Sequence, residues 1–276
     1  MLGDQVRLEA YYDAIKNQVK DGMVVAEIGT GTGILSAYAA AHTKAQIFAI
    51  EYYESSAKMA SDMMEAAGFT HVKVLNGESY GITLTPQPDI LITETIGALG
   101  PEEHIVEICY DFKKRHPNLK TLVPSRLKVF AEPIRSRTVL DAERVFYDYY
   151  ACASFGTFDY KAIRPGLQKI RSSSIWYDDL DDAETVGERM LLADYHLGVT
   201  ELSAFTQIVD VSDARDADAV HIYFEATLDH GNILSTHYAQ DFTHWRHGYV
   251  HKPKEATKLK VSYLAGSKWI EVSWES

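Results

Sequence analysis

The sequence predicts an α/β fold in two parts, a doubly wound parallel sheet followed by antiparallel strands with an inserted arm. A glycine-rich loop follows a short apolar strand near residue 29, as in α/β sheets that bind nucleosides. From Thr121 onward, short alternating runs appear, which are typical of antiparallel strands. Residues 143–195 are rich in tyrosine and then in acidic residues, and they fit no single helix or strand. We therefore expect two domains, 1–123 and 124–276, with the arm at about 143–195.

The composition is that of a globular protein. Hydrophobic residues make up 46% and charged residues 24% of the 276 positions. The formal net charge of −12 argues against nucleic acid as a partner and favours cationic substrates. No apolar run approaches the ~20 residues that span a bilayer. We therefore expect a soluble, cytoplasmic protein that binds neither nucleic acids nor membranes.

The periodicity of apolar residues predicts the elements in order. Apolar residues recur at helical spacing over 4–20, where Asp21-Gly22 ends the helix. In the rest of the first domain, we expect strands at 24–28, 47–50, 72–75 and 90–92. We expect an alanine-rich helix directly after the glycine loop and further helices at 59–67 and 106–114. The second domain contains alternating runs, which predict strands, at 127–131, 203–209, 220–228, 258–264 and 269–274.

The glycine loop reads E-I-G-T-G-T-G-I-L at 27–35. Gly29, Gly31 and Gly33 let the backbone turn sharply and approach a ligand at a helix N-terminus. The spacing departs from the dinucleotide pattern G-x-G-x-x-G, because Ile34 stands where the last glycine would be. Glu27 would repel a pyrophosphate, whereas a ligand with an ammonium group would accept it. These two departures argue against NAD.

Two acidic residues follow the next strands. Glu51 ends the strand at 47–50, 18 positions after Gly33 (51 − 33 = 18), where a carboxylate can accept both ribose hydroxyls of an adenosine. Glu78 follows the strand at 72–75, where it could reach the adenine edge or lie on a surface turn. This order of strand, glycine loop, helix and acidic strand end is that of the nucleoside half of a doubly wound domain.

The strand at 90–92 leads into two further carboxylates. Glu94 follows the strand directly, and a loop with Gly97, Gly100 and Pro101 brings Glu103 nine positions later (103 − 94 = 9). Two carboxylates on one loop raise the pKa of at least one of them unless a cation lies between. A guanidinium would satisfy both in bidentate fashion, although a solvated acidic loop would give the same pattern.

With these motifs the chain resembles the protein arginine N-methyltransferases, a class I group dependent on S-adenosylmethionine. The resemblance rests on four segments, M-L-G-D-Q-V-R at 1–7, E-I-G-T-G-T-G-I-L-S at 27–36, T-E-T-I-G-A-L-G-P-E-E at 93–103 and T-H-W at 243–245. Many methyltransferases share the second segment. The double glutamate followed by T-H-W, in that order, is specific to the family.

The resemblance implies a role for each matching residue. Glu94 and Glu103 would clamp the substrate guanidinium, and Trp245 would wall the substrate pocket. His244 would meet Asp4, and we expect this pair to accept the proton lost on methyl transfer. The expected ligands of the cofactor are Arg7 at its methionine carboxylate, the loop glycines Gly29, Gly31 and Gly33, Glu51 at the ribose and Glu78 at the adenine. No metal is expected.

The resemblance also implies a fold and an assembly. The family combines a Rossmann-like class I methyltransferase domain with an antiparallel β-barrel domain that carries a dimerisation arm, so we expect a homodimer. Two departures stand out. Thr95-Ile96 replaces the Trp-Met of many relatives, and the chain begins three residues before Asp4, so we expect no aromatic helix over the cofactor.

Several alternatives stay open at this point. The substrate could be arginine in a protein or peptide, or free L-arginine or a small guanidine metabolite. A pseudo-enzyme that binds the cofactor and partners only is a third reading, disfavoured by the intact glutamates and T-H-W segment. The sequence does not fix the number or symmetry of the methyl groups added. The histidines at 230, 237, 247 and 251 match no metal-ligand spacing, and we expect them on the surface.

Overall fold

The computed structural model describes residues 2–152 and 164–275. Contacts divide the chain into two compact units. The first comprises Met1–Lys128, Asp194–Ser203 and Glu225–Ser235, and the second comprises Val129–Ala193, Ala204–Phe224 and Thr236–Ser276. The sequence predicts two continuous domains, whereas these units alternate along the chain. The domain boundary near residue 123 therefore stays a prediction.

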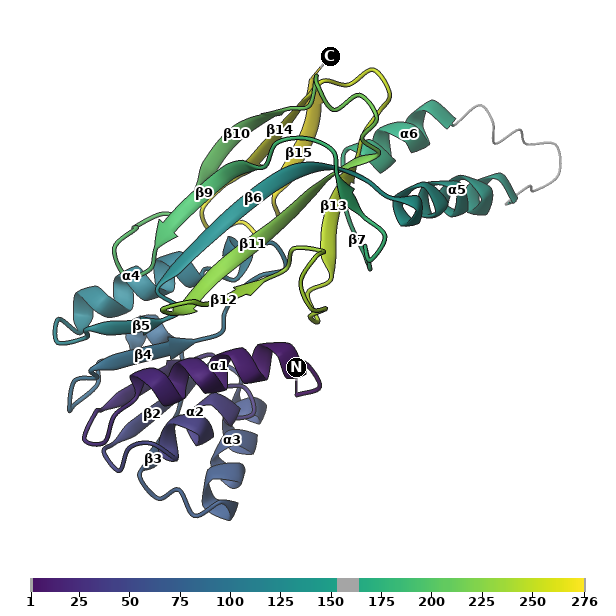
Figure 1. The fold of residues 1–276 in the computed structure, drawn as a ribbon. Helices are drawn as coiled ribbons and strands as arrows, with labels where there is room; N and C mark the ends of the chain where they lie inside the picture. Colours follow the sequence, from purple (N-terminus) through teal and green to yellow (C-terminus); the bar gives the residue numbers. More distant parts are fainter. Residues whose placement is uncertain (1, 153–163, 276) are drawn as a thin grey trace. The chain divides into compact units, whose positions relative to one another are not determined.

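The first unit is built on a parallel sheet of five strands in the order β3-β2-β1-β4-β5 (Figure 1). The strands are β1 (Val25–Ile28), β2 (Ile47–Glu51), β3 (Val72–Asn76), β4 (Ile90–Thr93) and β5 (Thr121–Val123). Every residue of β1, β2 and β4 is buried. Such fully buried strands occur where helices cover both faces of a parallel sheet.

Helices lie on both sides of this sheet (Figure 1). They are α1 (Gln5–Gln18), α2 (Ile34–Ala40) and α3 (Glu54–Ala66) on one side and α4 (Ile105–Arg115) on the other, with short 3₁₀ turns η1 (Ser79–Gly81) and η2 (Pro101–Glu103). Helix α1 begins where the Asp4 side chain accepts the backbone N–H of Arg7 at 3.0 Å. It then buries Tyr11, Ala14 and Ile15.

The elements predicted for the first half are confirmed, most of them within one or two residues at each end. Helix α3 is the exception, because it begins at Glu54, five residues before the predicted start. The first turn of α3 is mostly exposed and polar, so it shows no helical spacing of apolar residues. The buried side of the helix is formed by residues such as Ala57 and Ala60. Strand β5 was not predicted, because its three residues are too few to show a pattern.

The remaining strands are antiparallel and form two sheets. One has the order β7-β13-β11-β6-β8, with β12 paired to β11 and β9 to β6; the other has the order β10-β14-β15. Their bounds are β6 (Arg126–Arg135), β7 (Ile175–Asp178), β8 (Glu184–Thr185), β9 (Met190–His196), β10 (Phe205–Asp210), β11 (Ala219–Asp229), β12 (Asn232–Ser235), β13 (His247–His251), β14 (Lys258–Tyr263) and β15 (Glu271–Glu275). Among the described strands the pairings close no ring, so the barrel stays a prediction.

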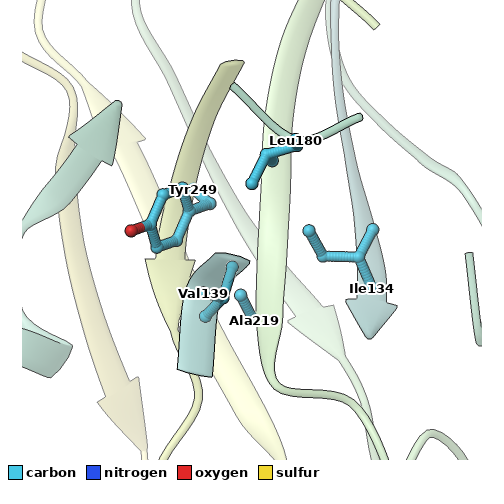
Figure 2. Close-up of a cluster of buried hydrophobic side chains, with 5 residues drawn as sticks. All are labelled: Ile134, Val139, Leu180, Ala219 and Tyr249. Carbon is cyan, nitrogen blue, oxygen red and sulfur yellow. The ribbon is translucent and has the colours of Figure 1, made fainter. Parts of the chain in front are cut away.

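The stretch predicted to form the arm contains several elements rather than one. It begins within α5 (Arg137–Cys152), continues through α6 (Arg164–Ser172) and ends in β7, β8 and β9, while 153–163 lie outside the described residues. Helices α5 and α6 contact each other, and α6 also contacts β13. Figure 2 shows the cluster that holds the start of α5 in place, Ile134, Val139, Leu180, Ala219 and Tyr249. Each of these five side chains is fully buried.

Within the described residues, no helix combines the length and the apolar character that a membrane crossing requires.

Candidate active site

The predicted site residues of the first unit gather at the carboxyl ends of β1, β2 and β4. The glycine loop follows β1, Glu51 ends β2, and Glu94 follows β4. In the sheet order, β1 lies between β2 and β4, so the chain leaves these neighbouring strands in opposite directions. Open α/β sheets bind their ligands at this kind of switch point.

The loop after β1 requires glycine at two positions. Gly29 and Gly33 have φ angles of +75° and +84°, which L-residues rarely adopt. A Cβ on Gly29 would lie 2.8 Å from the Cγ2 atom of Thr95, and a Cβ on Gly33 would lie 2.9 Å from the Cε atom of Met64. Gly31, between them, also has a positive φ of +52°. The loop therefore keeps its backbone close to the strand ends, as its predicted role demands.

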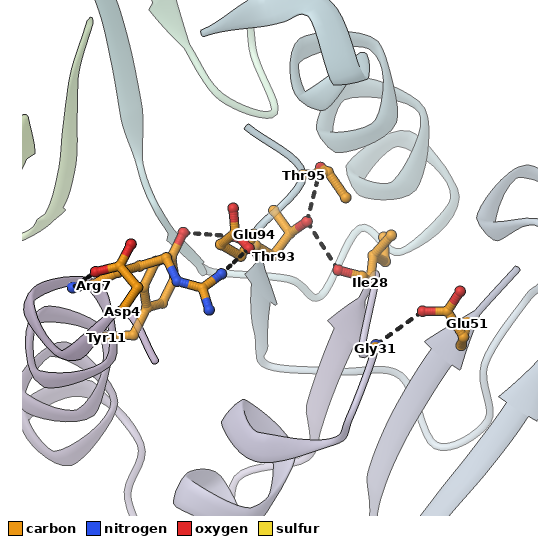
Figure 3. A network of polar contacts seen from close by, with 9 residues as sticks. All are labelled: Asp4, Arg7, Tyr11, Ile28, Gly31, Glu51, Thr93, Glu94 and Thr95. Atoms are coloured by element: carbon orange, nitrogen blue, oxygen red, sulfur yellow. Dashed lines mark hydrogen bonds and ion pairs between the residues drawn. The ribbon is translucent and has the colours of Figure 1, made fainter. Parts of the chain in front are cut away.

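Glu51 is held by this loop. One carboxylate oxygen accepts the N–H of Gly31 at 2.9 Å (Figure 3), and the other accepts the N–H of Tyr53 at 2.9 Å. These bonds orient a carboxylate that is 7% exposed. Asn76, at the end of β3, donates to the carbonyl of Glu51 at 3.0 Å. Glu78 is exposed just before η1, so the ribose and adenine roles of Glu51 and Glu78 stay predictions.

Arg7 and Glu94 form a buried ion pair through the Nη1 and Oε2 atoms (Figure 3). Their side chains are 5% and 7% exposed. Next to them, the Tyr11 hydroxyl donates to the carbonyl of Thr93 at 2.9 Å, which ties α1 to the end of β4. The sequence predicts a ligand carboxylate for Arg7, whereas the structure brings Arg7 to Glu94. The five donors of a guanidinium can serve both partners, so the predicted role of Arg7 stays a prediction.

Burial dominates the electrostatics of Glu94. It raises the pKa of Glu94 to about 7, with Arg7 opposing the rise and the charge of Glu103 adding to it. Glu103 itself is exposed, yet partial burial raises its pKa as well. A cation placed against both carboxylates would reverse these shifts, because it favours the charged forms.

Sequence reasoning missed the role of Glu102, the residue before Glu103. Its carboxylate turns back into the loop and accepts the N–H of Leu99 at 3.1 Å. Burial raises the pKa of Glu102 to about 7. A Cβ on Gly97 would lie 2.5 Å from the Oε2 atom of Glu102, so only glycine fits there. Glu102 thus shapes the loop that presents Glu103, and no sequence pattern distinguished the two adjacent acids.

Glu27 is the other acid of the site, and its position before Gly29 did signal it. The carboxylate is 1% exposed and accepts the hydroxyls of Thr30, at 2.6 Å, and Ser36. Burial raises its pKa to about 7 against these hydrogen bonds. Glu27, Arg7 and Glu94 line one cavity of about 20 Å³ together with Leu2, Leu8, Tyr11, Gly29, Thr30, Thr32, Ile34 and Leu35.

The T-H-W segment belongs to the second unit. Thr243 begins a turn in which its carbonyl accepts the N–H of Arg246 at 3.2 Å. Trp245 is 7% exposed and packs edge-on against Phe224, with 5.1 Å between ring centroids. His244 is exposed, and its ring lies 4.2 Å from that of Trp245. Since Asp4 belongs to the first unit, the Asp4–His244 pair stays a prediction.

The expectation of surface histidines is wrong for part of the set. His247 is 3% exposed and accepts the N–H of Leu180 at 2.9 Å, and His237 pairs with Glu132 at 2.7 Å. His247 opens β13, of which the first four residues are all buried, and His237 follows the end of β12. Among the described residues, no group of three or more His, Cys, Asp and Glu side chains is arranged to hold a metal ion.

Comparisons with known proteins agree on one family. No protein-family model matches the chain. Probable protein arginine N-methyltransferase 1.2 of Arabidopsis thaliana is 26% identical over 286 residues, which are 98% of this chain and 74% of that protein. Protein arginine N-methyltransferase PRMT10 of Arabidopsis thaliana is 29% identical over 154 residues, and protein arginine N-methyltransferase 7 of Danio rerio is 36% identical over 124. In sequence, the chain is similar to protein arginine N-methyltransferases.

Solved structures of protein arginine N-methyltransferases share the fold. Protein arginine methyltransferase 10 of Arabidopsis thaliana has a TM-score of 0.70 at 21% identity, over 96% of this chain and 86% of that chain. The PRMT1 enzyme-prozyme complex of Trypanosoma brucei, heterotetrameric and with AdoHcy, has a TM-score of 0.74 at 19% identity, over all of this chain and 92% of that chain. Together with the parallel sheet, they support a Rossmann-like fold for the first unit.

The matches to two of the curated protein arginine N-methyltransferases are partial. The chain spans 39% of the length of PRMT10 of Arabidopsis thaliana and 18% of the length of protein arginine N-methyltransferase 7 of Danio rerio.

Proposed function

We propose that this chain transfers a methyl group from S-adenosylmethionine to a guanidino nitrogen of arginine in a protein or peptide. One observation carries the proposal. The buried Glu94 carboxylate, at the carboxyl end of β4, already binds a guanidinium, that of Arg7. It does so beside a glycine loop and acids typical of nucleoside sites. The names of the relatives support the same chemistry.

The residues present suit S-adenosylmethionine by their chemistry. Glu51 would hold the ribose, the positive-φ glycines would let the ligand approach the backbone, and Glu27 places a buried carboxylate beside a ligand with an ammonium and a sulfonium group. The cavity of about 20 Å³ holds roughly one water. Cofactor binding therefore requires lining side chains to move, and Leu2, which is 54% exposed, is the least restrained of them.

The two glutamates address the central difficulty of the reaction. A guanidinium has no spare lone pair, and its pKa above ~12 forbids simple deprotonation near neutral pH. If Glu94 and Glu103 bind the guanidinium unequally, its positive charge is held on two of its nitrogens, and the third nitrogen becomes more nucleophilic. Each pair at ~4 Å and an effective dielectric near 20 contributes on the order of 4 kcal/mol before desolvation.

The remaining requirement is alignment and proton removal. When bound, S-adenosylmethionine would supply the methyl group and keep the bonding electron pair on sulfur as S-adenosylhomocysteine. The glutamate grip would hold the target nitrogen in line with the carbon–sulfur bond. The nitrogen gains the methyl group and loses one proton, for which the Asp4–His244 pair is the proposed acceptor.

Mass spectrometry on arginine peptides tests the proposal. Glu94→Gln and Glu103→Gln should each lower methyl transfer about a hundredfold or more, because each removes a charge from the transition state. Binding of S-adenosylhomocysteine should persist, and Glu65→Gln, a change of an exposed glutamate on α3, should leave turnover unchanged. Wild-type turnover in either site variant would contradict the clamp.

The substrate panel includes free L-arginine. Methylation of free L-arginine without methylation of peptides would move the substrate to small guanidine compounds. Retained S-adenosylhomocysteine binding with no methylation at all would instead favour a cofactor-binding pseudo-enzyme.

We further propose a homodimer formed through the 143–195 arm, a closed barrel in the second half and a cytoplasmic location. Helices α5 and α6 expose Leu140, Val145 and Ile170 at 47%, 61% and 53%, which supports an interface there. Sedimentation should show a dimer that Val145→Glu dissociates, whereas Val199→Glu, a change at a valine that is 71% exposed, should not. A monomeric wild type would contradict the dimer, and cell fractionation checks the location.

A further inference from the structure

A large cavity in the second unit contains none of the candidate active-site residues, although it shares Leu140 with the proposed dimer interface. Its volume is about 940 Å³, at the upper end of the range of small-molecule pockets. Helices α5 and α6, the turn at 215–218 and the start of the loop after β13 surround it. Its walls include apolar surface from Leu140, Ala217 and Pro253.

Lys252 is the unusual residue of this cavity. It lines the cavity directly after β13 and is only 5% exposed. Its backbone N–H donates to the carbonyl of Asp218 at 2.9 Å, but its ammonium forms no hydrogen bond or ion pair with any residue in the described ranges 2–152 and 164–275. Most of the side chain is packed, but the ammonium is not among the buried atoms that lack a partner, so it meets solvent at the cavity, where an anion can reach it.

The acids around the cavity are already engaged for the most part. Glu143 pairs with His251 at 3.0 Å, and Asp216 pairs with Arg135 at 3.3 Å. Asp218 accepts the N–H of Ser136 at 2.9 Å. The fourth acid, Glu255, is exposed at the rim. Three exposed cations also line the cavity, Lys169, Arg215 and Lys254.

Buried side chains pack behind two sides of the cavity. The buried cluster in Figure 2 joins α5 to β11 and β13 through Val139, Ala219 and Tyr249. On the α6 side, the buried Arg171 stacks on Trp176 at 4.2 Å and donates to the Tyr249 hydroxyl at 2.9 Å. A cavity whose walls are fixed in this way loses little entropy on binding a ligand.

We propose that this cavity binds a small phosphorylated molecule, with its phosphate on the ammonium of Lys252. An ammonium binds phosphate as a compact point charge, and the cations at the rim would attract the ligand. The apolar wall would cover the organic part of the molecule. This proposal does not depend on the methyltransferase function, because it uses no residue of that site.

Calorimetric titration with phenyl phosphate, at constant ionic strength, tests the proposal on the full chain. Wild type should bind one equivalent saturably. Lys252→Met keeps the length of the side chain and removes its charge, so affinity should fall about tenfold or more. Lys260→Met, a change of an exposed lysine on β14, should leave affinity unchanged.

Three outcomes would overturn the proposal: no saturable binding by wild type, equal affinity of Lys252→Met and wild type, or an equal loss in Lys260→Met. Thermal unfolding without ligand checks that the variants fold. If Lys252→Met does not fold, the double variant Arg215→Gln, Lys254→Gln replaces it, and it should lower affinity severalfold. Wild-type affinity in that double variant would then refute the site.

Discussion

Replacing Glu27 by glutamine should stabilise the protein at alkaline pH while it impairs the site. The carboxyl of Glu27 is 1% exposed, and burial raises its pKa from a usual 4.5 to about 7. The folded state therefore holds a proton that the unfolded state releases. This contribution to stability is fully present below pH 4.5 and is lost as the pH rises through 7.

The magnitude follows from the pKa shift. A rise of about 2.5 units (7 − 4.5), at about 1.4 kcal/mol per unit, corresponds to about 3 kcal/mol of stability lost by the wild type across this interval. Glutamine has no charge to bury, and its carbonyl can still accept the hydroxyls of Thr30 and Ser36. The variant should match the wild type near pH 4.5 and exceed it by up to that amount near pH 8.

Urea unfolding at several pH values measures this difference. The other buried acids, Glu94 and Glu102, are present in both proteins, so subtraction isolates Glu27. Glu65→Gln, which changes an exposed residue on α3, should show no such divergence. A difference between Glu27→Gln and wild type that stays the same at pH 5 and pH 8 would refute the reasoning. The variant should also bind S-adenosylhomocysteine more weakly, because the ligand loses its carboxylate partner.

Two further changes probe the second unit and the glycine loop. Burial lowers the pKa of His221 from 6.5 to about 3, so its contribution to stability is complete above pH 6.5 and is lost on acidification. Below pH 6.5, the free energy of unfolding of His221→Gln, measured in urea, should therefore fall by about 1.4 kcal/mol less per pH unit than that of the wild type. Parallel pH dependences of the two proteins would contradict this. Gly33→Ala should destabilise the protein by up to about 1 kcal/mol more than Gly22→Ala in urea unfolding. Both glycines have φ near +85°, but only an added Cβ at Gly33 would press on another side chain, the end of Met64, so equal losses of stability would contradict the clash.

The sequence pattern of single strands and of the residues that follow them was sufficient to predict most of the candidate site in the first unit. The glycine loop, the acid at the end of β2 and Glu94 after β4 all follow from an apolar strand and the residue that ends it. Glu27 could also be identified, because an acid before the first glycine is chemically distinctive. Helix α3 began too late in the prediction because its exposed first turn has no apolar period.

Long-range pairings could not be predicted in the same way. Arg7 and Glu94 are 87 positions apart, and neither residue carries a local sign of its partner. The inward positions of His247 and Lys252 depend on strands β11 and β13 and on α5, which come together only in the folded chain. Such positions follow from tertiary packing, which overrides the usual surface preference of histidine and lysine.

The buried acids of the first unit show how stability and function oppose each other here. Glu27 and Glu94 are each kept from water, and each has a pKa raised to about 7 by that burial. Burial lowers the stability of the free protein near neutral pH, since both carboxyls resist ionisation. The same low-dielectric surroundings strengthen the attraction of an ionised carboxylate for a bound cation. The same residues therefore lower the stability of the free protein and strengthen its binding of a guanidinium or a sulfonium ligand. This opposition is expected of a binding site rather than of a structural core.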